Sequence, residues 1–178
     1  MDNRPYTIEF YFDATFEAML MNVWDKLAEA GVPSYYQARG VRPHLTVAVL
    51  EHGDEVQICP IVKTFAQALP PLSITFVGVV LLPGSRCSVG LELIVTKELL
   101  DLQAALYDQL YTSGNPPVDR YAPDLWMPRG SISKNLSYPD ALRTVEVCGQ
   151  HIQFGSARLR ELGFAEFNPR RQIMDWAL

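Results

Sequence analysis

The stretch Arg42-Pro43-His44-Leu45-Thr46-Val47 is the part of the sequence that decides the fold. We predict a strand here, and successive side chains of a strand point to opposite faces. His44 and Thr46 would then share one face, with Leu45 and Val47 on the other. An imidazole titrates near neutral pH, so it can take or give a proton at a phosphate ester. The alternatives are that His44 is a core or turn histidine and that Thr46 is simply a β-forming residue.

A second stretch of the same form, Met127-Pro128-Arg129-Gly130-Ser131-Ile132, occurs later in the chain. Each stretch has a proline, a polar residue, one spacer, a hydroxyl residue and an aliphatic residue. Side by side, two such strands would gather His44, Thr46, Arg129 and Ser131 in one polar cleft. An imidazole and a guanidinium flanked by hydroxyl groups suit a phosphate better than a neutral ligand. The alternative for Arg129 is an ordinary surface arginine.

The composition is that of a globular protein whose partners are small. The 178 residues are 48% hydrophobic and 20% charged, enough for one core or two closely packed lobes, and the net charge is −5. A protein that grips long nucleic acid such as DNA usually has a basic surface. We therefore expect a nucleotide or short RNA end, held in a local basic pocket. No apolar run reaches the ~18 residues that span a bilayer, so no membrane partner is expected.

The three cysteines are scattered through the chain and are odd in number. None forms a C-x-x-C pair, so the sequence indicates neither a zinc site nor a disulfide framework, and we expect no metal and no cofactor. The first ten residues do not resemble a signal peptide. A reducing, cytoplasmic location is the simplest expectation.

Apolar spacing predicts an alternation of strands and helices along the chain. The order resembles a loose internal duplication of strand–helix units, which indicates an α+β fold with prominent antiparallel strands. We expect residues 1–178 to form a single domain of two packed lobes, each contributing one motif strand. The expected strands span 7–12, 44–50, 72–82, 87–96, 127–133, 154–167 and 173–178; the expected helices lie at 16–30, 56–69 and 97–111, with a fourth beginning at 137–140.

The first stretch, RPHLTV, resembles the His-x-Thr motif of the two-histidine (2H) phosphoesterases, the superfamily of 2′-5′ RNA ligases and cyclic phosphodiesterases. That family has two lobes of strands and helices around a central cleft, with one His-x-Thr/Ser motif in each lobe. The resemblance covers nearly the whole chain in length, spacing and order of elements. In the second motif Arg129 stands where the family has its second histidine, so this motif is degenerate.

The resemblance implies an enzyme acting on a 2′,3′-cyclic phosphate or a 2′-5′ phosphodiester at an RNA or nucleotide end. In the family one histidine activates the attacking water or hydroxyl group, the other protonates the leaving oxygen, and no metal is needed. Here His44 would be the sole proton carrier, while Thr46, Arg129 and Ser131 would hold the phosphate. A guanidinium stays charged in proteins and cannot act as a general acid or base near neutral pH. We therefore expect reduced activity.

Three residues near the motifs are candidates for binding the rest of the substrate. Arg42 is a further phosphate candidate, and Tyr36 and Trp126 could stack a base, as aromatics around the family's cleft often do. For the two aromatics, packing between the lobes is the simpler alternative. Other basic residues that could reach a phosphate are Arg39, Arg86, Arg120 and Lys134.

Two further hypotheses differ in class from an active enzyme. The first is a catalytically impaired relative that binds a nucleotide or RNA end without turnover. The second is a globular domain with no ligand in this cleft. Turnover separates the enzyme from the binding protein, and stabilisation by a ligand separates the binding protein from the domain without one.

Overall fold

The computed structural model describes residues 5–33, 35–167 and 169–178. These residues form an α+β fold with four helices and seven strands, as the sequence predicted, and none of these helices is long and apolar enough to cross a membrane. The strands are β1 (Tyr6–Phe12), β2 (His44–Leu50), β3 (Leu72–Leu82), β4 (Cys87–Leu93), β5 (Gly130–Leu136), β6 (Gly155–Phe167) and β7 (Arg170–Ala177); the helices are α1 (Ala14–Glu29), α2 (Glu55–Ala68), α3 (Lys97–Thr112) and α4 (Tyr138–His151).

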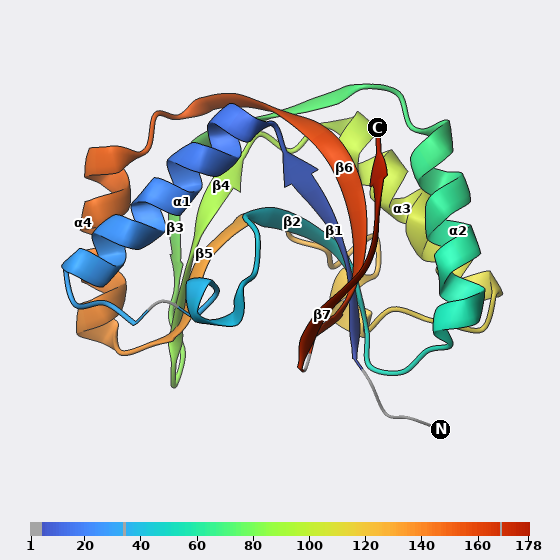
Figure 1. Cartoon of the computed structure of the whole chain (residues 1–178), viewed down its shortest axis with the longest axis horizontal. Helices are drawn as coiled ribbons and strands as arrows, with labels where there is room; N and C mark the ends of the chain where they lie inside the picture. Colours follow the sequence, from blue (N-terminus) through green and yellow to red (C-terminus); the bar gives the residue numbers. More distant parts are fainter. Residues whose placement is uncertain (1–4, 34, 168) are drawn as a thin grey trace.

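All strand pairings are antiparallel, and the strand order is β1-β2-β5-β4-β3-β6-β7. Because β1 also pairs with β6, the first six strands close on themselves. The long strand β6 is shared: its first residues pair with β3, and the remainder lies between β1 and β7. In Figure 1, β6 runs from one half of the molecule to the other.

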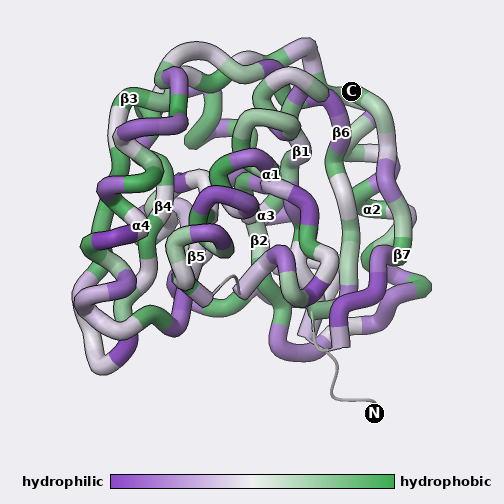
Figure 2. Tube along the Cα trace, turned by 60° about the vertical axis from the view of Figure 1, so that its left-hand side comes forward, coloured by the Kyte–Doolittle hydropathy of each residue, from purple (hydrophilic) through white to green (hydrophobic). Residues whose placement is uncertain are grey.

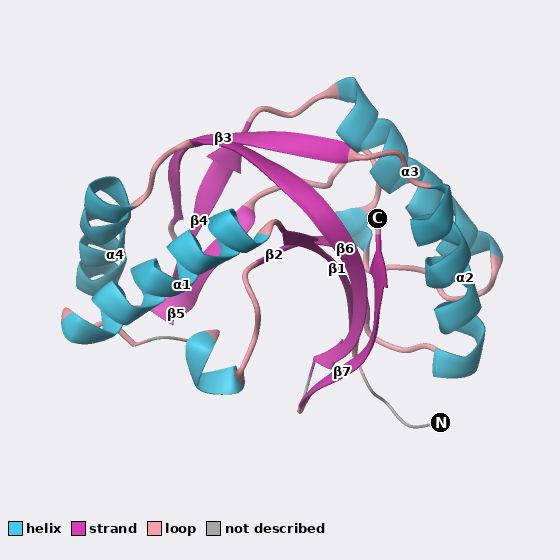
Figure 3. Cartoon of the chain, turned by 45° about the horizontal axis from the view of Figure 1, so that its top comes forward, coloured by secondary structure: helices cyan, strands magenta, loops and turns pink. Residues whose placement is uncertain are grey.

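The helices lie in two pairs at opposite ends of the molecule (Figures 1 and 3). One pair, α1 and α4, lies beside β3, β4 and β5; the other, α2 and α3, lies beside β1, β2, β6 and β7. The two motif strands, β2 and β5, belong to different halves and meet in the middle. That the halves are two lobes of one domain stays a prediction.

Each helix buries an apolar stripe and begins at a capping side chain. In α1 the carboxylate of Asp13 accepts a hydrogen bond from the backbone amide of Phe16 at 3.1 Å. Such a cap satisfies one of the free amides of the first turn and stabilises the helix by about 1 kcal/mol. Thr96 and Ser137 cap α3 and α4 in the same way. The buried face of α1 carries Phe16, Leu20, Val23, Trp24 and Leu27.

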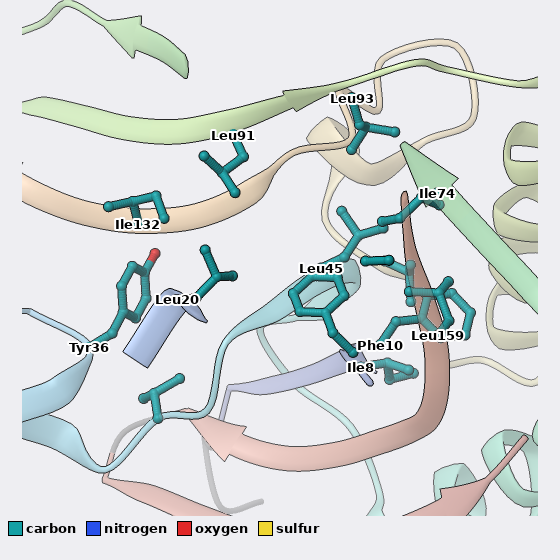
Figure 4. Packing of buried hydrophobic residues seen from close by; sticks show 14 of the residues in the cluster. Ile8, Phe10, Leu20, Tyr36, Leu45, Ile74, Leu91, Leu93, Ile132 and Leu159 are labelled. Carbon is teal, nitrogen blue, oxygen red and sulfur yellow. The ribbon is translucent and has the colours of Figure 1, made fainter. Parts of the chain in front are cut away.

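The core is continuous between the two halves. Figure 4 shows Phe10 and Leu45 of one half near Leu91 and Ile132 of the other, all of them buried. Burying one such side chain contributes roughly 1.5–3 kcal/mol. The exception is β7, which is mostly exposed and coloured largely hydrophilic in Figure 2. This strand therefore covers the outer edge of β6 and contributes little to the core.

A bulge in β2 lies at the end of the first motif. Ile8 pairs with Ala48 and Glu9 with Thr46, so Val47 is the extra residue of β2. A bulge re-aims the side chains that follow it. His44 and Thr46 precede the bulge and share a face, as expected, while Leu45 and Val47 are fully buried on the other side.

The second motif strand begins later than the predicted range 127–133. β5 starts at Gly130 and continues to Leu136, so Arg129 lies immediately before it. Pro128 has no amide hydrogen for a ladder, which explains the late start. At its other end β5 extends past the predicted range, because Leu136 pairs with Cys87 of β4. β4 ends at Leu93, earlier than the predicted range 87–96, because Thr96 caps α3.

Candidate functional site

The two motifs meet through their spacer residues. Leu45 of β2 pairs with Gly130 of β5, and this is the single bridge between the two strands in the described residues. In an antiparallel pair, the residues on either side of a bridge lie opposite one another across the two strands. His44 therefore lies across from Ser131, and Thr46 across from Arg129.

A cleft of about 410 Å³ opens over this junction. Its walls carry all four residues of the two motifs: His44, Thr46, Arg129 and Ser131. The four residues that the sequence pattern predicted to lie together therefore line one cleft in the structure. Their roles in binding or catalysis stay predictions. The volume lies within the range of small-molecule sites, about 300–1,000 Å³.

His44 is 5% exposed, and both ring nitrogens have neighbours. Nδ1 lies 2.7 Å from the backbone carbonyl oxygen of Arg42. A carbonyl oxygen only accepts, so Nδ1 carries a hydrogen and donates it. Nε2 lies 3.7 Å from the carboxylate of Glu9. The rings of Tyr36 and His44 pack in a T-shaped arrangement at 5.7 Å between centroids, which restrains the imidazole.

Glu9 is a buried carboxylate at the base of the cleft, and hydrogen bonds surround it. The Thr7 hydroxyl donates to Oε1 at 2.7 Å, the Tyr11 hydroxyl donates to Oε2 at 3.1 Å, and Arg170 donates two bonds of 2.9 Å. Burial opposes ionisation, but His44 and Arg170 outweigh it and lower the pKa of Glu9 to about 2. Glu9 is therefore ionised at neutral pH.

Arg129 has a different environment. Its side-chain carbons lie over Gly90 of β4, where an added Cβ would come within 3.4 Å of Cδ. In the part of the chain that the structure describes, no hydrogen bond or ion pair joins its guanidinium to another side chain. Arg129 is partly exposed and lines the cleft. Its five N–H groups can therefore meet a phosphate in a bidentate arrangement.

Two tyrosines add hydroxyl groups to the site. Tyr36 lines the cleft, and its hydroxyl interacts with that of Ser131. Burial raises the pKa of Tyr36 to about 12, so the phenol is neutral. Tyr121 lies beside Thr46, and burial raises its pKa too, although Arg120 and Arg129 oppose the shift. Both phenols can donate hydrogen bonds at neutral pH.

A smaller cavity of about 150 Å³ adjoins the first, and Thr46, Arg129 and Ser131 line both. Trp126 lies at this side cavity and outside the walls of the main cleft. Its ring is 7% exposed and its Nε1 donates to the Thr46 carbonyl oxygen at 3.2 Å. The indole therefore braces the first motif strand, and its buried position limits stacking.

Arg42 lies outside both cavities, although it is two residues from His44. Its guanidinium donates hydrogen bonds to Glu17 and Glu161 and covers the ring of Tyr11, 4.2 Å from the centroid. The bonds to Glu17 and Glu161 raise its pKa further. The structure therefore places Arg42 in an ion-pair network between α1 and β6. Its backbone carbonyl oxygen accepts the hydrogen bond from Nδ1 of His44.

Of the remaining basic candidates, two line the cleft and two lie outside it. Arg120 and Lys134 line the cleft, whereas Arg39 and Arg86 do not. The Lys134 ammonium lies 4.3 Å from the Tyr35 ring centroid and 4.4 Å from that of Phe167. Four cationic side chains therefore face the cleft against two carboxylates, Glu9 and Glu51, in a chain of net charge −5; the cations are Arg120, Arg129, Lys134 and Arg170. Within the described residues, no group of three or more His, Cys, Asp or Glu side chains could hold a metal ion.

Sequence reasoning missed Glu9, Arg170 and Tyr121. A signal for Glu9 exists in the sequence Thr7-Ile8-Glu9-Phe10-Tyr11, where one acid stands within an aromatic strand. A charge in a buried strand needs a partner. The partner, Arg170, comes from the other end of the chain, and only the tertiary structure reveals it.

No protein-family description and no curated protein sequence matches the chain. Solved structures do match it along its length. E. coli LigT complexed with 3′-AMP superposes with a TM-score of 0.67 and 15% identity, covering 98% of each chain. LigT complexed with NADP⁺ gives 0.64 and 17%, covering 100% of this chain and 99% of that one. Kluyveromyces marxianus Usb1 gives 0.52 and 8%, covering 99% of each.

At these identities the similarity concerns the fold. The chain has the α+β fold of LigT, which confirms the two-histidine phosphoesterase-like fold predicted from the sequence.

Proposed function

We propose that this cleft binds the phosphate end of a nucleotide or short RNA and acts on a 2′,3′-cyclic phosphate or a 2′-5′ phosphodiester there. The observation that carries the proposal is the Leu45–Gly130 pairing, which brings the side chains of both motifs to one cleft. The excess of cations around that cleft adds local attraction for an anion in an otherwise acidic chain.

Each motif residue has a chemical role in this proposal. Arg129 binds the non-bridging phosphate oxygens and stabilises the charge that grows on them. The hydroxyl groups of Thr46 and Ser131 donate hydrogen bonds to the same oxygens. His44 carries the proton that the reaction needs. The LigT structures with 3′-AMP, ATP and NADP⁺ support a nucleotide as the ligand of this fold.

A second candidate function is binding without turnover. The observation that favours it is Arg129 itself, because an arginine cannot exchange a proton near neutral pH. The cleft then has one proton carrier where the two-histidine mechanism has two. General acid–base help contributes about 10²–10⁴-fold in rate, so a full rate would require another group to supply the second proton.

The test separates binding from turnover. Purified protein is mixed with 2′,3′-cyclic AMP or 3′-AMP, and its melting temperature and hydrolysis of the cyclic nucleotide are measured. A ligand at 100 times its dissociation constant stabilises the folded state by about 2.7 kcal/mol. We expect this stabilisation in the wild type, its loss in Arg129→Ala, and its retention in the control Arg86→Ala, which removes an arginine outside the cleft.

The outcomes are distinct. Stabilisation with turnover supports the enzyme, and stabilisation without turnover supports the binding protein. A melting temperature that stays constant up to millimolar nucleotide would contradict both.

A further inference from the structure

We propose that Glu9 is a positioning residue that places a fixed negative charge beside Nε2 of His44 and thereby makes His44 the proton donor of this site. The inference rests on the proposed function, which it deepens by assigning a direction to proton transfer. It comes from the contacts of His44 and Glu9, two buried residues on neighbouring strands.

The two ring nitrogens of His44 face different groups. Nδ1 donates to the Arg42 carbonyl oxygen at 2.7 Å, so a neutral ring would have its lone pair on Nε2. Nε2 faces the Glu9 carboxylate at 3.7 Å. A second proton on Nε2 places a cation beside this anion. An opposite charge within about 4–6 Å favours the charged form of a titrating group.

Glu9 is fixed as an anion by its own contacts. Thr7, Tyr11 and Arg170 supply its hydrogen bonds, and both of its oxygens are engaged. Arg170 comes from β7, whereas Thr7 and Tyr11 lie on β1 with Glu9, so residues of two strands hold the carboxylate. A buried carboxylate held in this way cannot rotate to follow a ligand. It therefore acts as a stationary charge beside Nε2.

The 3.7 Å separation is longer than a hydrogen bond, so Nε2 is not fully engaged by Glu9. A phosphate or ester oxygen that enters the cleft can therefore receive the Nε2 proton. In hydrolysis of a 2′,3′-cyclic phosphate, a water oxygen bonds to phosphorus and one ring P–O bond breaks. The electron pair of that bond stays on the leaving 2′ or 3′ oxygen, which takes the proton from His44 Nε2. The attacking water loses one proton to solvent, and solvent then reprotonates His44.

Several other charged groups face the same region. On the His44 side, Arg170 lies beside Glu9, and Tyr11 has a pKa raised by burial and by Glu9, so this phenol is neutral. Across the cleft stand Arg120, Arg129 and Lys134, which all repel an imidazolium. The cleft wall also carries a second carboxylate, Glu51, but Glu9 is the one that forms an ion pair with the His44 ring. Its removal therefore leaves more cations than anions around His44.

The first experiment needs no substrate. The three histidine rings are followed by ¹H–¹⁵N NMR as pH is raised from 5 to 9, and His44→Ala assigns the His44 signals. We expect the neutral His44 ring to carry its hydrogen on Nδ1. We also expect Glu9→Gln to lose the Nε2 proton at a lower pH than the wild type does. Glu55→Gln, which removes an arginine-paired glutamate outside the cleft, should behave like the wild type.

The variant Glu9→Gln leaves Arg170 buried without its partner and could fail to fold. The double variant Glu9→Gln/Arg170→Met removes both charges and is compared with Arg170→Met, so that the two proteins differ only in the charge of Glu9. Identical His44 behaviour in the wild type and in the folded variants would overturn the assignment of Glu9, whatever ligand the cleft binds.

The second experiment measures kcat/KM for 2′,3′-cyclic AMP against pH. A proton donor predicts activity that falls as pH rises, and a general base predicts the opposite. We expect the falling limb to lie at a lower pH in Glu9→Gln, so that activity on the alkaline side is lower than in the wild type. Activity that rises through neutral pH would overturn the donor role. A protein without turnover would contradict the proposed enzyme, while the NMR comparison would still test Glu9.

Discussion

The two motifs have the same form in the sequence but different environments in the structure. His44 is almost fully buried, and its ring nitrogens face the Arg42 carbonyl and the Glu9 carboxylate. Arg129 is partly exposed, lies before its strand begins, and forms no ion pair among the described residues. In the proposed function, the first motif therefore handles the proton and the second receives the anion. Two halves of similar order can thus perform different parts of one task.

The largest expected effect comes from making the two motifs alike. Arg129→His would place a second proton carrier opposite Thr46, with His44 and Ser131 unchanged. We expect hydrolysis of 2′,3′-cyclic AMP to rise by about 10²–10⁴-fold, the usual contribution of a positioned acid or base. The rate is measured at saturating substrate for the wild type and the variant.

The control for this gain is the double variant Arg129→His/His44→Ala. The two histidines would act as a unit, so the gain should vanish when His44 is removed. A variant that folds, binds nucleotide and shows no gain would mean that the cleft has a binding role only.

The next effect concerns the stability of the folded protein at acid pH, which depends on Glu9. The pKa of Glu9 is about 2 in the folded state against 4.5 ordinarily. Its contribution to stability is therefore fully present above about pH 4.5 and is lost as pH falls towards 2. We expect Glu9 to contribute on the order of 3 kcal/mol to this pH dependence. Urea unfolding at pH 6, 4 and 3 measures it, and the slope should be weaker in Glu9→Gln/Arg170→Met than in Glu55→Gln. Equal slopes in the two variants would contradict the buried ion pair.

The sequence predicts those parts of the site whose residues lie close together along the chain. Alternation along each strand correctly placed His44 with Thr46, and the repeated pattern placed both with Arg129 and Ser131 in one cleft. These are local rules of strand geometry. The order of helices and strands followed from apolar spacing and capping residues in the same way.

What the sequence could not show depends on long-range contacts. Glu9 receives Arg170 from the opposite end of the chain, and nothing near either residue specifies the pair. Arg42 shows the converse problem. The sequence makes it a phosphate candidate beside the first motif, but β2 begins at His44, after Pro43, and the arginine side chain turns to Glu17 and Glu161. Those two carboxylates are also distant in the sequence.

A smaller effect is expected from Gly90 of β4, which lies against the side chain of Arg129. A Cβ at Gly90 would lie 2.8 Å from the Gly130 carbonyl oxygen and 3.4 Å from Arg129 Cδ. Gly90→Ala should therefore destabilise the fold by about 1–3 kcal/mol, the usual cost of overpacking, and should weaken nucleotide binding. Gly78→Ala on the adjacent strand is the control, because its Cβ would make only an ordinary contact, 3.7 Å from Glu92. Similar melting temperatures for the two variants would show that the close approach is unimportant.

The smallest effect on binding is expected from Arg42, the cation nearest to His44 in the sequence. Its guanidinium is held by two carboxylates outside the cleft, whereas that of Arg129 faces the cleft. Arg42→Met and Arg129→Met each remove one guanidinium and keep a long apolar side chain. We expect Arg42→Met to change the dissociation constant for 3′-AMP by less than about twofold, because distant, screened charges contribute little. We expect Arg129→Met to weaken it by at least tenfold, the effect of losing a charge-assisted contact of about 1.4 kcal/mol or more.

Isothermal titration calorimetry, well below both melting temperatures, measures the two constants. Arg42→Met is also expected to lower the melting temperature slightly, since its removal leaves Glu17 and Glu161 without their cation. If the two variants lose affinity equally, the contrast between the motifs is wrong: the anion would then respond to the total charge of the protein, and Arg129 would have no special place in the cleft.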